Sequence, residues 1–205
     1  MDGSTGVTGV ILAGGRSRRL GRDKRLEPFA GETLFARVAK RLGEVCDEIV
    51  AVAADEDSRA ALPNVEAVRV VNDVYPDRGS LGGIYSGLAA ATNTWSIVVA
   101  TDMPFLNVRL LTHLLSLREG YDAVVPMVEG FPEPTHAAYA KTCLKPIEAR
   151  IQRNDLKIAK FFEDVHVRFV EEAELRRFDP DLDSFFNVNT PEDLERAQSL
   201  ARQGR

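Results

Sequence analysis

The chain has 205 residues, of which 44% are hydrophobic, enough for one well-buried core. Its formal net charge of −5 at pH 7 argues against a nucleic-acid coat or a membrane-surface protein, because each needs a basic face. The sequence contains neither a signal-peptide pattern nor an apolar run long enough for a membrane span. We therefore expect a cytoplasmic protein with no nucleic-acid or membrane partner. The two cysteines, Cys46 and Cys143, are far apart in the sequence, so they form neither a disulfide framework nor a metal-ligand motif. We expect them to be small residues of the core.

The first predicted element is a buried strand over Val7–Leu12, which ends at Ala13-Gly14-Gly15. Six basic residues follow between Arg16 and Arg25. Glycines let backbone N–H groups approach oxygen atoms closely, and basic side chains neutralise negative charge. This stretch is typical of a polyphosphate site. The alternative is a strand followed by a solvated basic loop.

Strands and helices alternate along the rest of the chain. Further strands are predicted at Glu48–Ala53, Val68–Val71, Ser96–Thr101, Ala123–Pro126 and Val165–Val170. Helices are predicted at Glu32–Gly43, Asp55–Leu62, Gly83–Ala91, Asn107–Arg118, Thr142–Arg153, Leu156–Phe162 and from Pro191, after the N-cap Thr190, to about Arg202. The alternation predicts an α/β protein with a mostly parallel sheet. Gly130–Tyr139 interrupts it and is expected to lead irregularly into a return strand.

Polar residues follow several of the predicted strands. Gly14-Gly15, Asn72-Asp73 and Asp102 all lie at strand C-termini, so they should meet at one edge of a parallel sheet. A carboxylate after a strand as apolar as the one before Asp102 needs a partner, and Mg²⁺ is a suitable one. The alternative for Asp102 is the N-cap of the next helix. For Asp73 it is ordinary turn chemistry.

Other candidates leave two interpretations open. Gly79, Gly82 and Gly83 either tighten a loop near a ligand or serve as plain turn residues. His136 either lines a pocket or is a structural histidine with satisfied nitrogens. The sequence has neither a Walker nor a G-x-G-x-x-G motif, and no evident nucleophile or general base. This combination favours group transfer onto a nucleophile that is already ionised, for which positioning and charge neutralisation suffice.

Leu12–Lys24, LAGGRSRRLGRDK, resembles the signature LAGGxSxRMGxDK of nucleotidyltransferases of the molybdenum cofactor type. Matching elements follow in order: GSLGG at 79–83, DMPF at 102–105, EPTHAAY at 133–139 and FFNVNTPEDL at 185–194. Over nearly its whole length the chain is similar to molybdenum cofactor guanylyltransferases. The resemblance implies a Rossmann-like three-layer fold of the nucleotide-diphospho-sugar transferase type in a single domain, 1–205. Its nucleotide-binding half would be about 1–104 and its acceptor-binding half about 105–205.

The resemblance also implies the reaction. GMP would pass from GTP to the terminal phosphate of molybdenum-loaded molybdopterin, with Mg²⁺ as cofactor, giving molybdopterin guanine dinucleotide and pyrophosphate. A phosphate monoester has a second pKa of about 6, so the acceptor is mostly dianionic at pH 7 and needs no general base. Molybdoenzymes or their chaperones would be partners. Alternatives are a nucleotidyltransferase that uses CTP or another phosphorylated acceptor, and a non-catalytic nucleotide-binding adaptor.

The residues that match the family's motifs receive expected roles. Those implied for the nucleotide are Leu12, Ala13, Gly14, Gly15, Lys24, Asp73 and Asp102. Arg19, Lys24 and Asp102 would be catalytic, with Asp102 also binding the metal. Those implied for the acceptor are Gly79, Gly83, Lys157, Asn187 and Asn189. Two positions depart from the family pattern: Ala54 stands where an asparagine often binds the nucleotide, and Lys157 stands where arginine is common.

Overall fold

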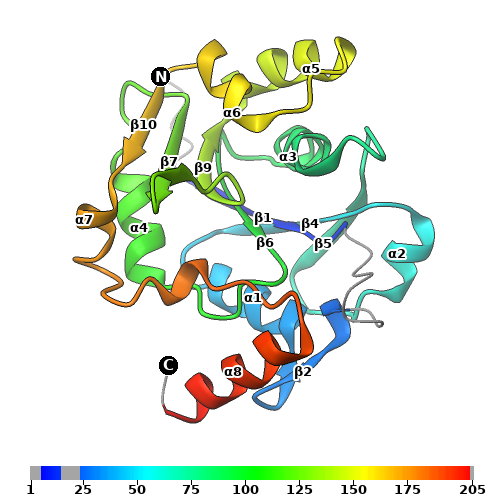
Figure 1. The fold of residues 1–205 in the computed structure, drawn as a ribbon. Helices are drawn as coiled ribbons and strands as arrows, with labels where there is room; N and C mark the ends of the chain where they lie inside the picture. The colour runs from blue at the N-terminus through cyan, green and yellow to red at the C-terminus, as the bar shows by residue number, and fades with distance from the viewer. Residues whose placement is uncertain (1–5, 15–23, 204–205) are drawn as a thin grey trace.

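The computed structural model describes residues 6–14 and 24–203, the side chain of Lys24 excepted. Its main sheet has the strand order β10-β7-β9-β6-β1-β4-β5, with β8 paired to β7 (Figure 1). The strands are β1 (Val7–Leu12), β4 (Glu48–Ala53), β5 (Val68–Asn72), β6 (Trp95–Ala100), β7 (Ala123–Val128), β8 (Phe131–Pro132), β9 (His136–Ala140) and β10 (Val167–Val170). Strands from both halves of the sequence thus belong to one sheet.

The parallel part of the sheet brings three strand ends level with one another. β1 lies between β4 and β6, and Leu12 pairs with Val52 on one side and Ala100 on the other. β5 continues the parallel order beyond β4. The chain then crosses back over β1 to form β6. Reversals of this kind open a crevice at the carboxyl edge of a sheet.

The predicted return strand is confirmed. β9 runs antiparallel between β6 and β7, and β10 is parallel to β7 at the sheet edge. The sheet is therefore mixed but mostly parallel, as expected.

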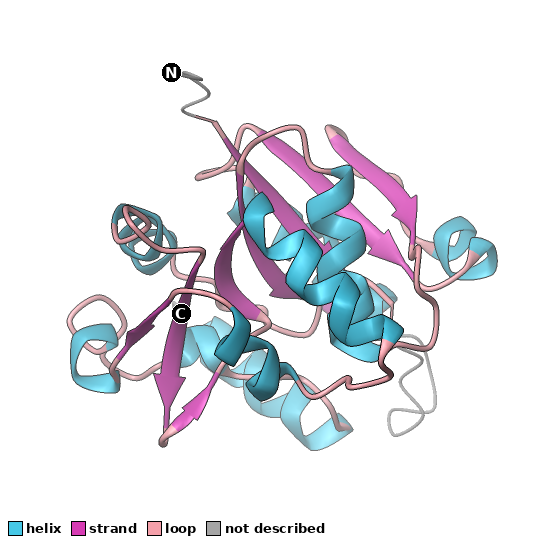
Figure 2. Ribbon diagram, turned by 90° about the horizontal axis from the view of Figure 1, so that it is seen from above, coloured by secondary structure: helices cyan, strands magenta, loops and turns pink. Residues whose placement is uncertain are grey.

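Helices cover both faces of the sheet and make three layers (Figure 2). α1 (Leu34–Leu42) and α4 (Val108–Ser116) contribute to one apolar cluster, while α3 (Gly79–Ala90), α5 (Leu144–Gln152) and α6 (Ile158–Phe161) contribute to the other. The predicted apolar face of α1 is buried at Phe35, Val38, Ala39 and Leu42. The short α2 (Glu56–Ala61) follows β4. The α/β three-layer class is thus confirmed. No described helix is long and apolar enough to cross a membrane.

The last helix, α8 (Pro191–Arg202), begins as predicted. The Thr190 side chain accepts a hydrogen bond from the Asp193 backbone N–H, and the Asp193 carboxylate accepts one from the Thr190 N–H. β2 (Pro28–Phe29) and β3 (Glu32–Thr33) form a separate two-stranded hairpin. α8 packs in a third apolar cluster together with Phe29 of β2 and Leu34, which follows β3. Val188, just before α8, also belongs to this cluster, which fixes the C-terminal segment beside the sheet.

The main difference from the sequence prediction is at α3, which begins at Gly79 and not at Gly83. The predicted glycine loop is therefore mostly helix. A Cβ on Gly82 would lie 2.7 Å from the Tyr75 carbonyl oxygen, and one on Gly87 would lie 2.3 Å from Val10 Cγ1. These glycines are needed because α3 packs closely on neighbouring backbone and on β1. The short hairpin β2–β3 and the single-turn helix α7 (Glu172–Leu175) were also not predicted.

Candidate active site

Two adjoining cavities lie at the carboxyl edge of the parallel strands. The larger, of about 720 Å³, is lined by Ala54, Asp55, Asp73, Asp77, Gly79 and Gly83, among others. The smaller, of about 250 Å³, is lined by Ala13, Arg25, Thr101, Asp102, Thr135 and Asn187, among others. Leu12, Gly14 and Ser80 line both. The expected meeting of Gly14, Asp73 and Asp102 at one edge is confirmed.

The segment that leaves β1 is fixed on both sides. The Ala13 N–H donates to the Val52 carbonyl (2.9 Å), and the Thr101 hydroxyl donates to the Leu12 carbonyl (2.9 Å). A Cβ on Gly14 would lie 3.3 Å from the backbone nitrogen of Ala54, so glycine allows the chain to pass close to the loop after β4. The backbone between the two cavities is therefore held in place by its neighbours.

Asp73 makes the turn contact that was the alternative for it, and it also lies on the larger cavity. Its carboxylate Oδ1 accepts hydrogen bonds from the Tyr75 N–H (3.0 Å) and the Ser86 hydroxyl (2.6 Å). The first is ordinary turn chemistry, and the second ties the turn to α3. The residue also lines the larger cavity. Its position is thus set by the fold before any ligand binds.

Asp102 lies on the smaller cavity and is only 7% exposed. The alternative that it caps the next helix is wrong, because Asn107 is the N-cap of α4 and accepts from the N–H groups of Arg109 and Leu110. The Asp102 carbonyl accepts from the Val188 N–H at 2.8 Å. This bond brings the preceding residue, Asn187, into the lining of the same cavity.

The smaller cavity is lined by four residues whose side chains carry hard oxygen atoms: Asp102, Asn187, Thr101 and Thr135. Within the described part of the chain, no three His, Cys, Asp or Glu side chains are grouped so that they could hold a metal ion. Mg²⁺ commonly binds through one or two carboxylates together with phosphate oxygens and waters. The residues therefore fit a Mg²⁺ ion that is bound jointly with a phosphorylated ligand.

Part of the predicted cationic stretch lies outside the described residues. Gly15 and Arg19 lie outside the described residues, as does the side chain of Lys24. Arg25 is described, and its guanidinium donates to the carbonyls of Ala13 (2.9 Å) and Ser58 (3.2 Å). The side chain is nearly buried and links the end of β1 to α2. The sequence pattern shows Arg25 only as one of the basic residues of the loop, so this structural role is not predictable from it.

The residues expected to bind the acceptor do not all come together. Gly79 and Gly83 line the larger cavity beside Asp73, and Asn187 lines the smaller one. Lys157 and Asn189 are exposed and line neither cavity. Ser80 and Thr135 also line the cavities but were not predicted from the sequence, although they lie in the motifs GSLGG (79–83) and EPTHAAY (133–139). Those motifs were the signal that could have identified them.

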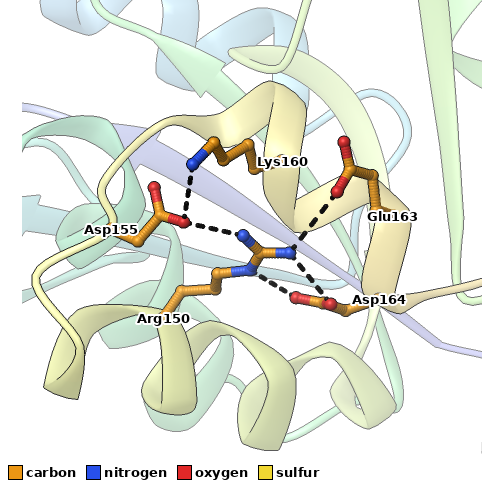
Figure 3. Close-up of polar contacts among 5 residues, drawn as sticks. All are labelled: Arg150, Asp155, Lys160, Glu163 and Asp164. Carbon is orange, nitrogen blue, oxygen red and sulfur yellow. Dashed lines mark hydrogen bonds and ion pairs between the residues drawn. The ribbon is translucent and has the colours of Figure 1, made fainter.

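Lys157 follows a turn that is held by ion pairs (Figure 3). The Arg150 guanidinium contacts the carboxylates of Asp164 (Nη2–Oδ1 2.9 Å) and Asp155 (2.8 Å), and its hydrogen bond lowers the pKa of Asp164. Asn154 in the same turn accepts a hydrogen bond from Arg78, which precedes α3. The α5–α6 turn is therefore linked to the start of α3, which lines both cavities.

His136 is a structural residue, but the expectation that its nitrogens are satisfied was wrong. The side chain is fully buried, and neither ring nitrogen has a hydrogen-bond partner among the described residues. Burial lowers its pKa to about 3, so the ring is neutral at physiological pH. The ring packs against Phe185, with 4.6 Å between the centroids. The preceding residue, Thr135, lines the smaller cavity.

Comparisons with known proteins agree with these observations. A family model described as a MobA-like NTP transferase domain matches residues 9–169. A protein described as a probable molybdenum cofactor guanylyltransferase, from Pelotomaculum thermopropionicum, is 38% identical over 97% of this chain and 95% of its own length. One from Natronomonas pharaonis, described in the same way, is 40% identical over 93% and 96%, respectively.

Solved structures extend the comparison. Molybdopterin-guanine dinucleotide biosynthesis protein A from Archaeoglobus fulgidus superimposes with a TM-score of 0.84 and 32% identity, covering 96% of this chain and 99% of that one. A 2-C-methyl-D-erythritol 4-phosphate cytidylyltransferase from Thermus thermophilus gives a TM-score of 0.71 at 19% identity, covering 97% of this chain and 100% of that one. The second likeness concerns the fold alone.

Proposed function

Because the chain belongs to the MobA-like NTP transferase family, among the molybdenum cofactor guanylyltransferases, we propose that it transfers GMP from GTP to molybdenum-loaded molybdopterin. The terminal phosphate of the pterin is the acceptor, and pyrophosphate is the second product. The observation that carries the proposal is the junction of the two cavities. There Gly14 at the end of β1 lies between Asp73 on one side and Asp102 on the other.

The charges of the two cavities indicate how the nucleotide is oriented. Asp55, Asp73 and Asp77 line the larger cavity, and no described basic residue does. Such a lining suits a base and a ribose better than a triphosphate. The smaller cavity combines the Gly14 backbone with Arg25 and Asp102. We therefore place the nucleoside in the larger cavity and the α-phosphate in the smaller one.

The transfer requires positioning and charge neutralisation more than acid–base chemistry. An oxygen of the dianionic pterin phosphate forms a bond to the α-phosphorus, while the bond from that phosphorus to the α–β bridging oxygen breaks and pyrophosphate leaves. Asp102, with Asn187 beside it, would hold Mg²⁺, which neutralises charge on the phosphate oxygens. Lys24 and Arg19 are proposed to contact the triphosphate, as is the backbone of Gly15.

Gly79 and Gly83 are better assigned to the nucleotide than to the acceptor, since they share the larger cavity with Asp73. Asn189 and Lys157 stay predictions for the acceptor. A cytoplasmic location and a molybdoenzyme partner also stay predictions.

The experiment supplies the purified protein with Mg²⁺, molybdenum-loaded molybdopterin and each of the four nucleoside triphosphates, and measures pyrophosphate release. GTP should be the preferred donor, and chelation of Mg²⁺ should stop the release. A preference for CTP would contradict the guanine assignment and leave nucleotidyl transfer intact. Binding of GTP without pyrophosphate from any acceptor would instead support the adaptor alternative.

A further inference from the structure

The larger cavity lacks the side chain that would be expected to read the base. Ala54 lines this cavity, at the position where the resemblance of the sequence to the family implies a nucleotide-binding asparagine. Its methyl group can neither donate nor accept a hydrogen bond. If the protein selects GTP, another residue of the cavity must recognise guanine.

Guanine differs from the other common bases in the donors on its Watson–Crick edge. Its N1–H and 2-amino groups are adjacent donors, whereas adenine, cytosine and uracil place an acceptor beside their donor. A carboxylate can accept both guanine hydrogen bonds, one with each oxygen, and charge-assisted bonds of this kind are the stronger ones. The residue that reads guanine by this chemistry therefore needs two available carboxylate oxygens.

The three carboxylates of the larger cavity differ in this respect. Asp55 caps α2, and its Oδ1 accepts from the Ser58 N–H at 2.7 Å. Asp73 uses its Oδ1 for Tyr75 and Ser86. Asp77 makes no hydrogen bond or ion pair with any residue that the structure describes.

The turn that carries Asp77 is nevertheless held in place. Asp77 has a φ of 64° in the left-handed region, and the Arg78 N–H donates to the Tyr75 carbonyl at 3.3 Å. The Arg78 guanidinium donates to Asn154 in the α5–α6 turn. We propose that Asp77 reads guanine, accepting from N1–H and the 2-amino group with its two carboxylate oxygens. The inference rests on the proposed function, because it assumes that GTP is the donor and that the base occupies the larger cavity.

The test uses nucleotide analogues that change only the 2-position or the ribose. Dissociation constants for GTP, ITP (no 2-amino group), XTP (a carbonyl in its place) and 2′-deoxyGTP are measured by calorimetry with Mg²⁺. The proteins are the wild type, Asp77→Asn and the control Asp57→Asn, which makes the same charge change at an exposed residue of α2 that lines neither cavity. Asn tolerates a left-handed φ, so the Asp77 variant should fold.

The wild type and Asp57→Asn should bind GTP about 10-fold or more tightly than ITP, given the usual contribution of a bidentate base contact. In Asp77→Asn this preference for GTP over ITP should vanish, and GTP binding should weaken by about 10- to 100-fold. XTP should then bind better than GTP, because the asparagine amide can accept from N1–H and donate to the carbonyl at position 2.

Two outcomes for Asp77→Asn would overturn the inference while leaving the proposed function standing. One is an unchanged GTP-to-ITP ratio in Asp77→Asn. The other is a loss of discrimination against 2′-deoxyGTP alone, which would assign Asp77 to the ribose. The same change in Asp57→Asn would attribute the effect to net charge and also contradict the inference. Failure of the wild type to bind GTP at all would contradict the proposed function itself.

Discussion

The carboxyl edge of the parallel strands and the α5–α6 turn both carry candidate residues, but only the first assembles them around a cavity. Gly14, Asp73 and Asp102 follow β1, β5 and β6, whose ends are fixed by the sheet. Lys157 follows a turn held by local ion pairs and lies outside both cavities. The difference supports the proposal that residues at strand ends carry the chemistry, while the turn supports the start of α3.

The largest effect is expected for Asp102→Asn, at the strand edge. Loss of the carboxylate should lower kcat by at least about 100-fold, since it removes the charge that is proposed to hold Mg²⁺ against the phosphates. The melting temperature should change little, because Asp102 serves binding more than packing. Pyrophosphate release and thermal denaturation measure the two effects, with Asp57→Asn as the control. A large fall in melting temperature with normal turnover would contradict the role of Asp102.

Gly87→Ala tests the close packing that holds the strand edge against α3. The new Cβ would lie 2.3 Å from Val10 Cγ1, so overpacking should cost about 1–3 kcal/mol of stability in urea denaturation. Gly83→Ala is the matched comparison, since its Cβ would meet only the end of the Leu12 side chain at 3.1 Å. It should lose less stability but weaken GTP binding, because Leu12 lines both cavities. Equal stabilities would mean that α3 can move away from β1.

His136→Leu tests a buried residue at the start of β9, next in sequence to Thr135 of the smaller cavity. It removes two unpartnered ring nitrogens from the core, so the free energy of unfolding at pH 7 should rise by about 1 kcal/mol.

The pH dependence of the wild type supplies a second measurement. Burial lowers the pKa of His136 in the folded state to about 3, whereas its ordinary value is about 6.5. Between pH 6.5 and pH 3 the imidazole is therefore protonated in the unfolded chain but neutral in the folded protein. The contribution of neutral His136 to the free energy of unfolding is complete above pH 6.5. It is lost as the pH falls below that value, by at most about 1.4 kcal/mol per pH unit. Chemical denaturation between pH 4 and pH 7 should give a shallower acid limb for His136→Leu. A clear loss of stability at pH 7 would indicate that the ring has a polar partner.

The smallest effect is expected for Lys157→Ala, in the second region. Exposed charges contribute little, so the KM for the pterin should rise only about two- to fivefold and the Kd for GTP should stay within about twofold of the wild-type value. Steady-state kinetics and calorimetry separate these quantities. A large loss of GTP affinity would mean that the turn acts on the nucleotide and would erase the contrast between the two regions.

The sequence predicted the parts of the fold that depend on apolar periodicity and chain order. The buried strands, the apolar face of α1 and the Thr190 cap of α8 follow directly from local patterns. The start of α3 was missed, because helical glycines at 79–83 resemble a loop until their packing against Tyr75 and β1 is known. In the candidate site, the meeting of Gly14, Asp73 and Asp102 was predictable, because the carboxyl ends of parallel strands lie at one edge of the sheet. The unpartnered nitrogens of His136 depend on packing between distant segments, which no local pattern reports.

The transfer of a labelled phosphate tests the central claim most directly. The protein is supplied with Mg²⁺, molybdenum-loaded molybdopterin and GTP that is radiolabelled on either the α- or the γ-phosphate, and the products are separated. Nucleotidyl transfer predicts that the α-label appears in the pterin product and the γ-label in pyrophosphate. A γ-label on the pterin, or no label on it from either form of GTP, would contradict the account.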